Sequence, residues 1–164
     1  DRYYPELGGQ WQTIPHAVLI DGLIKDGRLK VKKDNEKITF HDPCYLARHN
    51  DIVDETRGVV SAIGQLVEMP RNGKDSFCCG AGGGNYWGGQ GGTARINDVR
   101  AQEAFDTGAD KIATSCPFCN LMLTSSAAKH TEERKVFDVA ELVLEKLENK
   151  PSNSSNSSNP SLSA

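Results

Sequence analysis

The sequence predicts an α/β fold in which a parallel sheet carries helices on both faces. Short strand-like segments alternate with longer amphipathic segments along the chain, a pattern typical of parallel sheets with helical connections. The segment 1–149 has the size of one ordinary domain with its own core. Each group of cysteines follows a predicted strand, which indicates cysteine loops at the carboxyl ends of the strands.

The first half of the chain predicts two helices and two strands. A helix begins near Thr13 and Pro15, because a capping residue followed by proline in the first turn favours a helix start. The segment "KITF" (37–40) predicts a short strand. Apolar residues recur at helical spacing over "ETRGVVSAIGQL" (55–66), and "LVEMP" (66–70) predicts a second strand that ends at its proline.

The second half continues the alternation after a glycine-rich loop. A helix is predicted over 93–107, followed by a strand in "DKIATS" (110–115). The next helix starts around Pro117, and "KVFDV" (135–139) predicts a last strand. A D-x-x-E pattern beginning at Asp138 predicts the N-terminus of a final amphipathic helix.

Composition excludes several classes of function. The net charge is -3 and no basic stripe is present, which argues against nucleic-acid binding. No apolar run approaches the ~20 residues of a membrane span, and no signal peptide is visible. The segment 150–164 is rich in serine and asparagine, which predicts a disordered tail. The chain does not start with methionine, so we expect it to be a piece of a longer protein.

The five cysteines form three groups that should meet in space. Cys44 follows the first predicted strand, Cys78 and Cys79 follow the second, and Cys116 and Cys119 follow the third. Because the carboxyl ends of parallel strands share one edge of a sheet, we expect the three groups to converge there. An odd number rules out a fully paired disulfide framework and favours ligands or redox thiols in a reducing, cytoplasmic compartment.

The chemistry of the cysteines leaves four interpretations open. Isolated cysteines are often small buried apolar residues, but grouping beside glycine and proline disfavours that reading. A structural zinc ion takes four ligands, whereas five thiols are available here. The adjacent pair Cys78 and Cys79 suits a larger, polynuclear iron–sulfur cluster, because successive side chains diverge. The "CPFC" segment (116–119) resembles a thiol–disulfide exchange motif, although that reading leaves the other cysteines idle.

The glycine-rich segment after the cysteine pair divides into two parts. Gly80 and its neighbours would let the backbone pass close to a bound cluster and donate N–H groups. The segment "GQGGTA" (89–94) formally fits a dinucleotide fingerprint, but it does not directly follow a strand, so we expect no nucleotide there. We assign no role to the run Gly88–Gly92.

Other side chains lie close to the cysteines in sequence. His41 precedes Cys44 by three residues and is interpreted either as a backbone-bonded histidine or as a hydrogen-bond donor or proton carrier near a cluster. Arg48 and His49 are candidates for holding an anion or are surface residues. Trp87 and its neighbouring tyrosine are interpreted as a shield against water or as a docking surface.

Three segments together resemble a known family. The sequences "HDPCYLARHN" (41–50), "FCCGAGGG" (77–84) and "SCPFCNLML" (115–123) are similar to the cysteine-rich CCG domain of heterodisulfide reductase B and D subunits. The same domain occurs in iron–sulfur subunits of glycolate and lactate oxidation systems and in other Fe–S oxidoreductases. In sequence, the chain resembles most the C-terminal CCG repeat of members that have two repeats.

The resemblance implies a site and a reaction class. It implies that five cysteines hold a noncubane [4Fe-4S] cluster, namely Cys44, Cys78, Cys79, Cys116 and Cys119. It implies an oxidoreductase subunit or domain for electron transfer. The electron donor would be a flavoprotein or ferredoxin-like domain, and the acceptor a disulfide or a quinone. Some members have membrane helices, so the parent protein could lie at the cytoplasmic face of a membrane.

Overall fold

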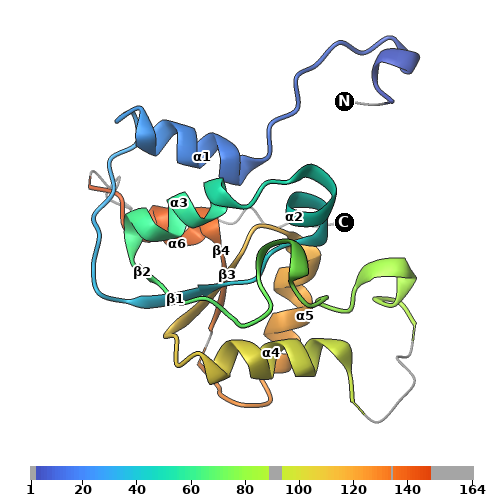
Figure 1. Cartoon of the computed structure of the whole chain (residues 1–164), viewed down its shortest axis with the longest axis vertical. Helices are drawn as coiled ribbons and strands as arrows, with labels where there is room; N and C mark the ends of the chain where they lie inside the picture. The colour runs from blue at the N-terminus through green and yellow to red at the C-terminus, as the bar shows by residue number, and fades with distance from the viewer. Residues whose placement is uncertain (1–2, 89–93, 134, 149–164) are drawn as a thin grey trace, which may run out of the picture.

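The computed structural model of the chain describes residues 3–88, 94–133 and 135–148, and a parallel sheet lies at its centre (Figure 1). The strand order in this part of the chain is β2-β1-β3-β4, and every pairing is parallel. The strands are β1 (Lys37–Phe40), β2 (Gln65–Leu66), β3 (Lys111–Thr114) and β4 (Val136–Asp138). The predicted α/β class is confirmed.

This strand order creates a switch point beside the two central strands. The chain runs from β1 outward to β2, returns across the sheet to β3 and continues to β4. The connections after β1 and β3 therefore leave in opposite directions. In open parallel sheets, ligands bind outside the carboxyl ends of such a strand pair. Phe40 and Thr114 end these two strands, and the segments that follow them carry three of the cysteines.

Helices cover both faces of the sheet, as predicted (Figure 1). Helices α1, α3 and α6 pack together on one face, and α4 and α5 pack together on the other. The short helix α2 stands near the carboxyl ends of the strands. The bounds are α1 (His16–Lys25), α2 (Cys44–Asn50), α3 (Asp54–Ile63), α4 (Ile96–Asp106), α5 (Pro117–Ala127) and α6 (Val139–Glu145).

The two faces have separate apolar cores because strand side chains alternate in direction. Ala113 and Phe137 pack with apolar residues of α1, α3 and α6. Their neighbours Ile112 and Val136 pack on the opposite face with residues of α4 and α5. The strands are therefore buried on both sides, as expected of a parallel sheet between helical layers.

Two predicted elements around Gly64 are shorter than expected. The helix predicted over 55–66 ends at Ile63, because Gly64 takes up extended backbone against β1. A Cβ at Gly64 would lie 2.7 Å from the Glu36 carbonyl oxygen, so the close approach requires glycine. The strand predicted over 66–70 is reduced to β2, since Met69 turns into the core beneath α4 and α5.

Other predictions differ at their ends or lie outside the described part of the chain. Helix α2 was not predicted, and the start predicted at residue 93 for α4 falls on an undescribed residue. The predicted disordered tail 150–164 and most of the Gly88–Gly92 run also lie outside the described residues. Within the described ranges, no helix has the length and apolarity needed to cross a membrane.

Candidate metal centre

All five cysteines line one pocket at the carboxyl ends of β1 and β3. The pocket has a volume of about 280 Å³, and its walls come from the start of α2, the loop after β2 and the start of α5. Cys79 and Cys119 are buried, whereas Cys44, Cys78 and Cys116 are half-buried. The expected convergence of the three groups is therefore present. It follows from the sheet topology, because each group lies in the segment after a strand and the parallel strands end at the same edge of the sheet.

Cys44 is placed by the turn that follows β1. The segment after Phe40 leads through Pro43, whose extended backbone sets the start of α2 at Cys44. Arg48 on the same helix donates from Nε to the Lys74 carbonyl oxygen at 2.9 Å, and a second guanidinium nitrogen donates to the Ser76 carbonyl oxygen. Arg48 therefore ties α2 to the segment before the cysteine pair, and these two bonds engage its guanidinium with backbone.

The adjacent cysteines are held on a loop that needs glycine. Gly80 has a φ of 88°, a left-handed conformation that side chains with a Cβ rarely adopt. Its N–H group lies 3.2 Å from the Cys78 Sγ and donates to it. Of the pair, Cys79 is buried and Cys78 is half-buried, as expected when successive side chains diverge.

Cys116 and Cys119 are set by the N-terminus of α5. Cys116 is the residue that caps this eleven-residue helix, and Pro117 occupies its first turn. Interaction with the Cys119 side chain, with smaller contributions from the N–H groups of Cys119 and Phe118, lowers the pKa of Cys116 to about 6. Burial opposes this shift. Cys116 is thus poised as a thiolate near neutral pH.

The pKa values of Cys79 and Cys119 shift in opposite directions. Ligand atoms of Cys79, Cys119 and His41 lie within 4.8 Å of one another. Hydrogen bonds from Cys119 and from His41 hold the pKa of Cys79 below that of an ordinary thiol. The same contacts with Cys116 and Cys79 raise the pKa of Cys119. Cys119 therefore holds its proton more strongly than Cys79 or Cys116 does.

Comparison with known proteins identifies the fold unit that carries this pocket. The family model described as a CCG cysteine-rich domain matches residues 38–124, from β1 into α5. This chain belongs to the CCG domain family. The match includes all five cysteines and the two central strands.

Curated relatives of this CCG domain are named as oxidoreductases. The EtfAB:quinone oxidoreductase of Syntrophomonas wolfei is 36% identical over 156 residues, covering 88% of this chain and 22% of the relative. The probable iron-sulfur-binding oxidoreductase FadF of Bacillus subtilis is 38% identical over 149 residues, with shares of 88% and 21%. One subunit of the dihydromethanophenazine:CoB–CoM heterodisulfide reductase of Methanosarcina barkeri is 34% identical over 150 residues, with shares of 88% and 37%. The chain thus spans between 21% and 37% of these relatives.

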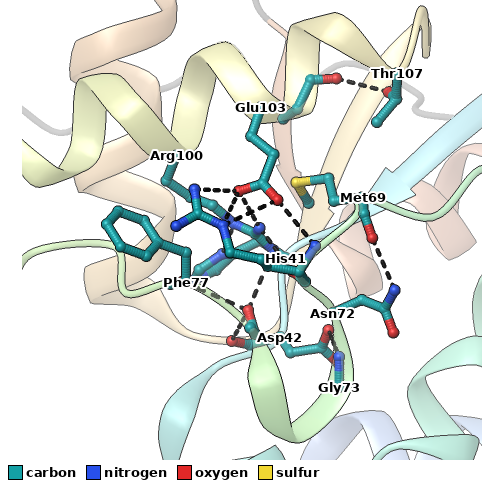
Figure 2. Close-up of polar contacts among 12 residues, drawn as sticks. His41, Asp42, Met69, Asn72, Gly73, Phe77, Arg100, Glu103 and Thr107 are labelled. Carbon is teal, nitrogen blue, oxygen red and sulfur yellow. Dashed lines mark hydrogen bonds and ion pairs between the residues drawn. The ribbon is translucent and has the colours of Figure 1, made fainter.

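A buried polar network includes His41 and Asp42, which line the pocket of this CCG domain (Figure 2). Arg100 of α4 is 0% exposed and donates from Nε to the Nδ1 of His41 at 3.0 Å. Its other nitrogens donate to the Glu103 carboxylate at 2.9 Å, the Arg71 carbonyl at 2.8 Å and the Ser76 hydroxyl at 3.1 Å. Burial, helped by the Arg100 charge, lowers the pKa of His41, although a hydrogen bond with Cys79 opposes it.

A second ion pair anchors the turn next to His41. Both oxygens of the buried Asp42 carboxylate accept from Arg57, at 2.7 and 3.1 Å. One of these oxygens also accepts the Gly73 N–H at 2.7 Å. Burial alone would lower the pKa of Arg57, but its hydrogen bonds with Asp42 and Glu68 outweigh burial and raise it. Asp42 thus joins α3 to the loop that leads to the cysteine pair.

Three aromatic rings gather at the mouth of the pocket. Tyr86 and Trp87 meet edge to face at a ring distance of 5.1 Å, and Phe118 lies 5.6 and 6.1 Å from them. Trp87 and Phe118 also line the pocket. Both roles considered from sequence, shielding and docking, are compatible with this position. His49 instead packs against Tyr45 with tilted rings whose centres are 5.1 Å apart, and it does not line the pocket.

The residues of the pocket fit a group with several metal atoms. The pocket volume of about 280 Å³ is far larger than a single metal ion needs. The donor set consists of soft thiols, and a backbone N–H group at Gly80 is already directed at one sulfur. A tetrahedral ion would use four ligands and leave one thiol without a role. The cavity and its donors therefore suit a polynuclear cluster.

Sequence reasoning missed Arg100 and the Asp42–Arg57 pair. Arg100 and Arg57 lie on predicted helices and Asp42 in the turn after β1, where charged residues are common, so none of them stands out by residue type. One signal was available for Arg100: it is adjacent to Ala101, and both fall on the buried side of α4. A charged residue on an apolar helix face is unusual unless it is paired.

Proposed function

We propose that this CCG domain binds an iron–sulfur cluster and passes electrons between a donor and an acceptor of a larger oxidoreductase. The proposed ligands are Cys44, Cys78, Cys79, Cys116 and Cys119. The observation that carries the proposal is the convergence of these five cysteines on one pocket. The oxidoreductase names of the relatives support the same role.

We further propose that the cluster is of the [4Fe-4S] type, with a noncubane core favoured. A cubane cluster is held by four cysteine thiolates, so a fifth thiolate in the same pocket favours an expanded core. The adjacent pair supports this view, since Cys78 and Cys79 approach the pocket from one loop. The zinc alternative gains no support from the relatives, one of which is named as iron-sulfur-binding.

The chain's own residues prepare the site for that cofactor, which would supply one-electron transfer when bound. Thiolates are the metal-binding form, and the pKa values of Cys79 and Cys116 are lowered, which favours that form. Cys119 must lose its proton on binding, so loading releases protons and is favoured by higher pH. Trp87 and Phe118 line the pocket and would stand beside the bound cluster.

The proposed partners follow from the oxidoreductase role. A flavoprotein or ferredoxin-like domain would donate electrons, and a disulfide or a quinone would accept them. Reduction of a disulfide to two thiols, or of a quinone to a quinol, takes two electrons from the donor and two protons from solvent. The names of two relatives, a quinone oxidoreductase and a heterodisulfide reductase, support these acceptor classes. We place the domain on the cytoplasmic side, free or at the membrane face, because its thiols are unpaired.

Anaerobic purification with iron and sulfide analysis and EPR spectroscopy tests the cluster. We expect a coloured protein with about four irons per chain, and a loss of iron when any one cysteine is replaced by serine. Leu121→Ser provides the control, since Leu121 is exposed on α5 and does not line the pocket. A colourless protein with stoichiometric zinc and no iron would contradict the proposal.

One observation favours a second candidate, thiol–disulfide exchange by "CPFC". Cys116 has a lowered pKa of about 6 at a helix N-terminus, with Cys119 buried behind it. In that reaction the Cys116 thiolate attacks a substrate disulfide and releases one thiol. Cys119 then displaces the second thiol and leaves a Cys116–Cys119 disulfide, so the protein loses two electrons.

A single variant separates the two candidates. Cys44→Ala removes a proposed cluster ligand but leaves "CPFC" intact. If iron-free Cys44→Ala protein keeps full disulfide reductase activity, thiol–disulfide exchange is the function. If the variant loses both iron and activity, the cluster proposal stands.

A further inference from the structure

We infer that Arg100 is a positioning residue that fixes His41 as a hydrogen-bond donor to the Cys79 sulfur. The inference concerns the order Arg100–His41–Cys79, in which each group donates to the next. It assigns one role to a histidine that could otherwise be a ligand, a base or a structural residue. Only its effect on a bound cluster rests on the proposed function.

The direction of the first hydrogen bond follows from the chemistry of arginine. A guanidinium group carries five N–H donors and no acceptor. Arg100 Nε lies 3.0 Å from His41 Nδ1, so this ring nitrogen must accept and cannot carry a proton. The imidazole proton therefore resides on Nε2. Figure 2 shows Arg100 lying between Glu103 and His41.

The second hydrogen bond uses the nitrogen that remains. A ring nitrogen of His41 and the sulfur of Cys79 belong to a group of ligand atoms within 4.8 Å of one another. Since Arg100 occupies Nδ1, the Nε2–H group is the one that remains for the Cys79 sulfur. Sulfur can accept a hydrogen bond, so we infer that this contact runs from the imidazole N–H to Cys79.

This arrangement is the reverse of that expected for a metal-binding histidine. A ligating histidine uses one nitrogen for the metal and donates the other N–H to a carboxylate or a carbonyl. Here Nδ1 of His41 accepts from the Arg100 cation, and Nε2 holds the proton. His41 therefore acts on the sulfur and leaves ligation to the five cysteines.

Arg100 is itself held so that it cannot turn away from His41. It is fully buried, and three further partners accept its other N–H groups: the Glu103 carboxylate, the Arg71 carbonyl and the Ser76 hydroxyl. Two of these partners belong to the loop that leads to the cysteine pair. Arg100 thus sets the His41 tautomer and also the position of the loop that carries Cys79.

The consequence for a bound cluster is a higher reduction potential. Hydrogen bonds to the sulfurs are among the features that set the potential of iron–sulfur clusters. A donor to a thiolate ligand stabilises the extra negative charge of the reduced state. Loss of either His41 or Arg100 should therefore lower the midpoint potential without removing iron.

The tautomer can be tested on iron-free protein by NMR of nitrogen-15-labelled histidine. We expect the His41 Nε2 signal to be pyrrole-like and the Nδ1 signal to be pyridine-like. A protonated Nδ1 would overturn the inference whether or not the protein binds a cluster. Arg100→Met removes the donor to Nδ1, and Gln102→Met on the same helix is the control, since Gln102 is exposed and donates to Asp106.

The role toward a cluster is tested by four variants of the loaded protein. His41→Gln keeps an N–H donor near the position of Nε2, and Arg100→Lys keeps a charged donor, whereas His41→Met and Arg100→Met remove the donors. We expect full iron content in all four, with a lower midpoint potential in the two methionine variants and partial rescue in the other two. Iron loss in His41→Met would identify a ligand and overturn the inference. An unchanged potential in folded Arg100→Met and His41→Met would also overturn it. Wild-type protein without iron would overturn the cluster proposal alone, because the tautomer test remains.

Discussion

Replacing Asp42 by alanine should destabilise the domain far more than replacing Glu68, although both carboxylates bind the same arginine. The side chain of Asp42 is 1% exposed, whereas that of Glu68 is 35% exposed. Asp42 accepts two bonds from Arg57 and one from the buried Gly73 N–H group. Asp42→Ala therefore leaves a partly buried cation and a buried amide without this acceptor.

The expected cost of Asp42→Ala is about 3 kcal/mol. Removing one partner of a buried ion pair costs ~3–5 kcal/mol, and the lower end applies because Arg57 keeps its bonds to Glu68. A loss of about 3 kcal/mol lowers the melting temperature of a domain of this size by roughly 6–12 °C. Glu68→Ala breaks a pair that is open to solvent on one side, so we expect a cost of about 1 kcal/mol or less.

Urea denaturation of iron-free, reduced protein measures both free energies of unfolding. Wild type, Asp42→Ala and Glu68→Ala are compared at one pH, and the slopes of the transitions are checked for equality. If the two variants cost the same within about 0.5 kcal/mol, burial of Asp42 contributes nothing special and the reasoning fails. A cost confined to Glu68→Ala would refute it as well.

Three further predictions concern backbone geometry and thiol chemistry. Gly80→Ala should cost about 1–2 kcal/mol and reduce iron content, because its φ is 88°, whereas Gly82→Ala in the same loop should be neutral by melting and iron assay. Gly58→Ala should destabilise the domain by about 1–3 kcal/mol, because the added Cβ would collide with the Asp21 carboxylate of α1. Gly22→Ala is the control: its added Cβ has no neighbour within 4 Å, so we expect a gain of about 0.5–1 kcal/mol in urea titrations. Iodoacetamide should alkylate Cys116 in iron-free protein at a rate that rises with pH and is half-maximal near pH 6, because the pKa of this thiol is about 6. Mass spectrometry measures the rate, and a midpoint above pH 8 would contradict that pKa.

Sequence reasoning found the parallel sheet and most of the order of its helices and strands because local and long-range signals agree in this chain. The final helix illustrates this: the D-x-x-E pattern at Asp138 forms a capping box, with the Ala140 N–H donating to the Asp138 side chain at 2.9 Å. The Asp138 N–H donates to Glu141 at 2.9 Å, which completes the pattern. Such contacts lie within one turn, so a single sequence suffices to predict them.

The elements that sequence reasoning missed depend on contacts between distant segments. The predicted strand over 66–70 looks regular by pattern, but Met69 packs into the core against α4 and α5, which lie far along the chain. Helix α2 has seven residues, too few to show an apolar period. Arg100 and His41 are 59 positions apart in sequence, and no local pattern predicts the hydrogen bond between them.

The cysteine loop is held in place by arginines from three elements, which sets the site before any metal arrives. The segment 71–76 contains no strand, yet Arg48 of α2 binds two of its carbonyls and Arg100 of α4 binds a third and a hydroxyl. Arg57 of α3 acts through Asp42, which accepts the Gly73 N–H. Arg100 is fully buried and Arg57 is partly buried, so water competes little for the hydrogen bonds of these two side chains. Small metal domains such as zinc fingers fold only with their metal. Here two apolar cores and this arginine set order the loop, so the iron-free chain should already hold its thiols together and the metal adds to a formed site.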